Sequence, residues 1–320
     1  MTTVPAYISV TTPVTQAIDR VKLLLFRPFD LGKWFTVGFG AWLATLGRGG
    51  GGGLNYSSHH ERRFNDVESF RQWTNHARDY VMSNLNWILP LAIAIALFVI
   101  ALVVLLTWLH SRGEFMFLHC VALNKAEIDV PWNRHAAGAN SLFCFRIVVW
   151  LISLLPIVPL LAFTGITAFR LVNEAGAIAD ILLGLIPLVL MFVAVFVFFF
   201  LIRKLTIDFV VPIMFLRGTK CLAAWSEFLG LLSMNVGHFI VYLLFQIVLA
   251  IVLGMIVLAA FLVTCCIACC VVMIPYVGTV LLLPIFTFKR SYSLYYLAQF
   301  GPQYDVFTSM ASPTPQAPVA

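Results

Sequence analysis

The chain has 320 residues, of which 61% are hydrophobic and only 11% are charged, and its formal net charge is +6. Such a composition excludes an ordinary soluble domain and is typical of a polytopic membrane protein. The positive charge flanks apolar runs, and no basic stripe interleaved with aromatic residues is present, so nucleic-acid binding is not expected.

Long, nearly uncharged apolar runs follow one another along the chain. A bilayer core about 30 Å thick requires roughly 20 apolar residues in a helix, and most of these runs reach that length. The sequence therefore predicts an all-α integral membrane protein with six transmembrane helices. We expect the spans at residues 34–47, 87–109, 143–169, 181–202, 239–262 and 271–288.

The first run, 34–47, is short for a span, but the distribution of charge supports it. With this span in place and the N-terminus in the cytoplasm, most lysines and arginines lie on the cytoplasmic side, as the positive-inside rule requires. Residues 48–86 then form an external loop, and both termini are cytoplasmic, in a bacterial inner membrane. We expect one membrane domain over residues 1–307 and a disordered cytoplasmic tail over 308–320, because that segment is rich in Pro, Ala and Ser.

An internal three-fold pattern accompanies the spans. An amphipathic stretch precedes a span at residues 14–26, 132–143 and 221–232, with apolar residues at helical spacing. The second and fourth spans are each followed by an acid–Phe pair, at Glu114 and Asp208, whereas the exit after the sixth span lacks the acid. We predict three pseudo-repeated units, each with an interfacial amphipathic helix on the cytoplasmic side.

Basic residues lie beside these amphipathic stretches and form a predicted cytoplasmic collar suited to anionic lipid headgroups. An alternative is that the collar only orients the protein in the membrane. The residues expected to bind lipid at the interface are Arg20, Lys22, Arg134, Arg217 and Lys220.

Glu114 and Asp208 lie just inside the predicted cytoplasmic boundary. Acids buried near a bilayer are costly and often mark proton or ion paths, so both are candidate coupling acids. The favoured alternative is structural pairing with Arg112, Arg203 or Lys204. Two further side chains carry expectations: Arg146 extends to the cytoplasmic surface, and Gln246 makes an interhelical hydrogen bond.

The cluster Cys265, Cys266, Cys269 and Cys270 stands near the external end of the predicted fifth span. Its CxxC spacing is compatible with a disulfide or with metal binding. Cysteine is also a small apolar residue that fills tight turns, and we favour this packing role. No metal site and no cofactor are therefore expected.

Several segments resemble known bacterial membrane families. The stretch FVVPIMFLRGTKCLAAWSEFLGLL, residues 209–232, resembles the glycerophosphoryl diester phosphodiesterase membrane domain family. The segments RPFDLGKWF, at 27–35, and IPYVGTVLLLPIFTFKRSYSLYYLAQFGPQYDVF, at 274–307, are similar to a related, uncharacterised bacterial multi-pass family. The resemblance implies a fold, and it implies no phosphodiesterase activity because no catalytic domain accompanies these segments.

No GxSxG, HExxH, Walker or dinucleotide-binding motif is present, so an enzyme is not expected. The leading interpretation is a noncatalytic inner-membrane protein that engages membrane lipids or a membrane protein partner. The alternative is a small-molecule or lipid transporter built on the repeats. The oligomeric state is left open.

Overall fold

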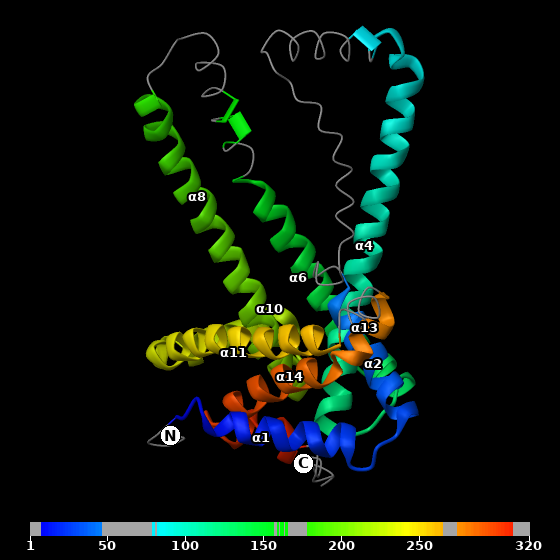
Figure 1. The fold of residues 1–320 in the computed structure, drawn as a ribbon, viewed down its shortest axis with the longest axis vertical. Coiled ribbons are helices and arrows are strands. Elements are labelled where there is room, and N and C mark those ends of the chain that lie inside the picture. Colours follow the sequence, from blue (N-terminus) through cyan, green and yellow to red (C-terminus); the bar gives the residue numbers. More distant parts are fainter. Residues whose placement is uncertain are drawn as a thin grey trace, which may run out of the picture.

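The computed structural model of the chain (Figure 1) describes residues 8–46, 79–80, 82–156, 159, 161–162, 164–165, 178–264 and 274–309. All regular elements in these residues are helical. In chain order they are α1 (Thr12–Val21), the π-helical turn η1 (Lys22–Phe26), α2 (Leu31–Thr45), α4 (Leu85–Leu123), α5 (Asp129–Arg134), α6 (Ala136–Leu154), α8 (Ile178–Leu205), the π-helical turn η2 (Thr206–Val210), α9 (Val211–Arg217), α10 (Cys221–Met234), α11 (Val236–Val263), α13 (Pro275–Leu281), α14 (Leu283–Ala298), the 3-10 turn η3 (Pro302–Tyr304) and α15 (Val306–Ser309).

Four helical stretches in the described part of the chain are long and apolar enough to cross a membrane, and each overlaps a predicted span. In Figure 1, α4, α6 and α8 run in the same general direction, whereas α11 runs across them. The four stretches are Leu85–Leu123, Ala136–Leu154, Val189–Arg217 and Val236–Val263.

The other two predicted spans have a different form. The first corresponds to α2, which has 15 residues; at 1.5 Å per residue it is about 22 Å long, shorter than a bilayer core. The sixth is divided between α13 and α14, which meet at Leu282. Six spans therefore stay a prediction, and four are supported by length and composition.

The other boundaries also shift. Helix α4 continues beyond the predicted 87–109 by fourteen residues, to Leu123. Helix α6 begins at Ala136 and ends at Leu154, earlier at both ends than the predicted 143–169. Most of the predicted external loop, residues 47–78, and the tail from residue 310 lie outside the described residues.

The buried core lies at the C-terminal end of α4 and not along the apolar helices. There α4 packs with α2, α6, α9 and α14, while η2 and α10 pack against α9 and against each other, and the first turns of α11 join them. We call this packed region the base. Aromatic rings fill it: the Phe209 ring stacks on Phe228 at 5.3 Å between centroids and meets Phe239 edge-on at 5.1 Å. Tyr242 and Tyr296, both fully buried, approach to 4.6 Å. Such pairs stabilise beyond the area they bury.

Close contact between α2 and α4 depends on glycine. A Cβ atom at Gly113 would stand 2.4 Å from Leu43 Cβ and 2.5 Å from the backbone nitrogen of Ala44. At Gly40 it would stand 3.4 Å from the Phe117 backbone. Small residues of this kind let helix backbones approach each other, as in membrane helix pairs. The short α2 thus packs closely against α4 along the side that carries Gly40 and Leu43.

Three backbone positions with positive φ follow the same spacing. Asn124 (φ 58°) ends α4, Gly218 (φ 65°) ends α9, and Gly301 (φ 142°) follows α14. Each stands ten residues after a residue in the base, namely Glu114, Asp208 and Ser291. Asn and Gly are the residues that most readily adopt the left-handed conformation at a helix end. Helices α4 and α9 therefore both end at a residue in the left-handed conformation.

Candidate functional site

Glu114 forms the centre of a buried charge cluster in the base. Its carboxylate is 2% exposed and lies on the part of α4 that packs in the core. The Oε1 atom is 3.8 Å from Arg146 Nη2 and 3.8 Å from His110 Nε2, and Oε2 is 4.0 Å from Arg290 Nη2. The two guanidinium groups come from α6 and α14, so this one acid joins three helices.

Arg146 differs from its prediction. It does not extend to a surface, because its side chain is 14% exposed and its Nη1 atom donates a hydrogen bond to Ser111 Oγ at 3.0 Å. The predicted partner of Glu114, Arg112, instead donates to the Trp132 carbonyl and lies over the Trp108 and Trp132 rings at 5.0 Å. Position along α4 therefore did not identify the arginine partners of Glu114.

Asp208 has the local partner that the sequence predicted. Lys204, one helical turn earlier, places its Nζ 2.7 Å from Asp208 Oδ2. Tyr242 on α11 donates its hydroxyl to the same oxygen at 2.9 Å. Gln246 donates to the Tyr242 hydroxyl at 2.9 Å and accepts from Lys204 at 3.4 Å. The structural pairing of Asp208 and the interhelical bond of Gln246 are thus both confirmed.

Arg290 connects the two acidic sites. It is 5% exposed, contacts Glu114 through Nη2, and donates from Nη1 to the carbonyl oxygen of Ile207, the residue before Asp208. On α14, therefore, a cation stands one residue before Ser291, the position that matches Glu114 and Asp208 in its distance from a positive-φ residue. No such role was predicted for Arg290 from the sequence; the available signal was an arginine in the segment that follows the sixth predicted span.

Arg20 is not an exposed collar residue. Its Nε and Nη2 atoms donate to the Val121 carbonyl at 3.0 and 2.7 Å, and Nη2 also donates to the Ala122 carbonyl at 2.6 Å. Its guanidinium lies 4.9 Å from the centroid of the Phe307 ring. These are the last carbonyls of α4, which have no partner within the helix. Arg20 caps α4, and we remove it from the set expected to bind lipid.

The other collar residues stand on the surface of the base. Arg134 and Lys220 are exposed, at the end of α5 and just before α10. Lys22 is 57% exposed and contacts Asp19 at 3.1 Å, and an exposed pair of this kind is weak. Arg217 is 3.0 Å from Glu227 and 6.0 Å from the Tyr304 ring centroid, so it is partly engaged. Three cations remain well placed for an external ligand.

The cysteine cluster Cys265, Cys266, Cys269 and Cys270 lies outside the described residues. Among the residues the structure describes, Cys120, Cys144 and Cys221 are free thiols. Within that same part of the chain, no group of three or more His, Cys, Asp and Glu side chains is arranged to hold a metal.

Comparison with known proteins identifies a family. A family described as a family of unknown function (DUF7544) matches residues 8–283. No curated protein and no solved structure matches the chain. The match covers α1 through α13. Because the matched family is a different one, the resemblance to the glycerophosphoryl diester phosphodiesterase membrane domain stays a prediction.

Proposed function

The chain belongs to the DUF7544 family, a family of unknown function, and from this premise we propose that it is a noncatalytic multi-pass membrane protein that engages anionic lipids. Four apolar helices suit it to a membrane location. The bacterial inner membrane, with both termini in the cytoplasm, is the location we propose. A membrane protein partner is the other ligand class for the same surface.

One observation carries the lipid proposal: cations are exposed at or beside helix ends on the surface of the protein. Lys22, Arg134 and Lys220 stand at three separate helix ends. Each basic residue near an anionic leaflet contributes about 1 kcal/mol of attraction. Three together favour an anionic lipid over a neutral one by up to roughly a hundredfold.

The test is native mass spectrometry of the full chain in detergent, titrated with phosphatidylglycerol or with phosphatidylcholine. We expect preferential retention of the anionic lipid, and at least about tenfold weaker retention when Lys22, Arg134 and Lys220 are all changed to Gln. Arg20→Lys serves as a control, because Arg20 faces α4 and not the surface. Equal binding of both lipids, or no change in the triple variant, would contradict the proposal. A stoichiometric protein in preparations from native membranes would favour the partner alternative.

The six-span architecture with three pseudo-repeats belongs to the same proposal. Its support is the recurrence of a positive-φ residue ten residues after Glu114, Asp208 and Ser291. Reporter fusions after residues 60, 170 and 268 are expected to report the external side. A cytoplasmic signal at residue 60 would remove α2 as a span.

A transporter remains the second candidate because acids are buried in the base. Glu114 and Asp208 are 2% and 7% exposed, and intramembrane or near-membrane acids are often coupling sites. In proteoliposomes, Glu114→Gln with Asp208→Asn is expected to abolish proton uptake driven by a membrane potential. Wild-type uptake that survives in the double variant would argue against coupling through these acids.

A further inference from the structure

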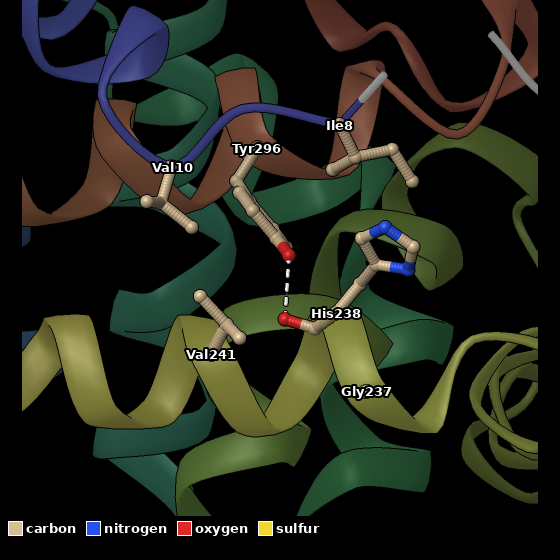
Figure 2. Close-up of a pocket in the computed structure, with 6 residues that line it drawn as sticks. All are labelled: Ile8, Val10, Gly237, His238, Val241 and Tyr296. Atoms are coloured by element: carbon tan, nitrogen blue, oxygen red, sulfur yellow. Dashed lines mark hydrogen bonds between the residues drawn. The ribbon is translucent and has the colours of Figure 1, made fainter. Parts of the chain in front are cut away.

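A pocket of about 390 Å³ lies between the N-terminal segment, the first two turns of α11 and the last turn of α14. Figure 2 shows the residues that line it: Ile8, Val10, Gly237, His238, Val241 and Tyr296. Its volume lies within the range of about 300–1,000 Å³ typical of ligand pockets. None of these residues belongs to the charge cluster or to the exposed cations.

Hydrogen bonds hold the N-terminal wall in place. The backbone N–H of Ser9 donates to Gln299 Oε1 at 2.8 Å, and Gln299 Nε2 donates to the Ser9 carbonyl at 2.9 Å. The Tyr292 hydroxyl donates to the Val10 carbonyl at 3.1 Å. Tyr292 on α14 and Gln299 just after it thus fix the backbone at Ser9 and Val10. These bonds hold the side chains of Ile8 and Val10 against the pocket.

The lining is mostly apolar, and its polar groups belong to Tyr296 and His238. The Tyr296 hydroxyl donates to the His238 carbonyl at 2.8 Å, a bond that Figure 2 shows across the pocket, so these two polar atoms satisfy each other. Aliphatic side chains form most of the remaining wall, and the exposed His238 imidazole is the polar group. Such a lining fits a hydrocarbon chain and gives a polar headgroup a partner at one end.

The pocket continues onto the exposed apolar surface of α11. Val241 lines the pocket and is 49% exposed. Leu244 (60%) and Val248 (52%) follow at intervals of three and four residues, so the three side chains share one helix face. A chain that lies along this face of a candidate span can enter the pocket without crossing polar surface.

We propose that the pocket binds one acyl chain of a membrane phospholipid, with the headgroup beside His238 at the first turn of α11. The proposal rests on the membrane function proposed above, but it uses a different surface from Lys22, Arg134 and Lys220.

The experiment is photo-crosslinking of the full chain in nanodiscs with a phospholipid that carries a diazirine in one acyl chain, followed by peptide mapping. Gly237→Leu supplies the test variant, because Gly237 lines the pocket and a Cβ there meets no atom within 4 Å. Gly254→Leu is the matched control, because Gly254 lies on the same helix and its Cβ also meets open space.

We expect saturable labelling of the peptide that contains Ile8 and Val10, reduced about tenfold or more by Gly237→Leu and unchanged by Gly254→Leu. Thermal midpoints of both variants check that the fold is kept. Labelling of the Val248 face with none at Ile8 and Val10 would overturn the pocket but leave the membrane function intact. Labelling at Ile8 and Val10 that Gly237→Leu leaves unchanged would also overturn it. Absence of labelling along α11 altogether would contradict both proposals.

Discussion

The two ends of α4 differ in which side chains are buried and which are exposed. Near its N-terminal end the side chains are apolar and exposed, with Leu97 at 63% and Phe98 at 68%. From His110 to Ala122 nearly every residue is buried, and this part carries Glu114. In water, apolar residues gather inside and charges outside. The reversal along one continuous helix shows that the first part is suited to lipid, while the second supplies the packed interior of the base.

The strongest test of this comparison places the same bulky side chain in both environments. Gly113→Leu puts a side chain into the contact with Leu43 and Ala44, and we expect a loss of roughly 3 kcal/mol or more in unfolding free energy. Gly254→Leu, on exposed α11, should have little effect. Thermal unfolding followed by size-exclusion chromatography in mild detergent measures both. Equal effects would mean that the base is not the stable region.

A second test removes one charge from the base. Glu114→Gln leaves Arg146 and Arg290 without their shared carboxylate, and breaking a buried ion pair costs about 3–5 kcal/mol. The control is Asp19→Asn, since the pair of Asp19 with Lys22 is exposed and weak. If Glu114→Gln were as mild as Asp19→Asn in the same unfolding assay, the cluster would not hold the three helices together.

The smallest expected contrast uses two leucines of α4. Leu118 is fully buried, so Leu118→Ala should lower the unfolding free energy by about 3 kcal/mol. Leu97→Ala changes a side chain that is 63% exposed, and we expect a much smaller effect. A large loss from Leu97→Ala would show that the upper part of α4 packs against protein.

Local patterns in the sequence predicted the local features. The four long apolar helices follow from composition, and Lys204 with Asp208 follows from a spacing of one helical turn. His110, one turn earlier on α4, is a local neighbour of Glu114, but its two arginine partners come from α6 and α14, and no pattern within α4 indicates them. Arg20 was placed in the collar for the same reason, since its acceptors stand 101 and 102 residues later in the chain.

The pinning of Ser9 by Gln299 has a consequence for biogenesis, because the two residues are 290 positions apart. During synthesis, α1 emerges first, yet its neighbour α14 is among the last helices to be made. The N-terminal segment therefore lacks its bonds to Tyr292 and Gln299 until the apolar helices between them have been made. Long-range contacts of this kind form late. A ribosome stalled before residue 283 would leave the N-terminal segment without the α14 contacts that hold it.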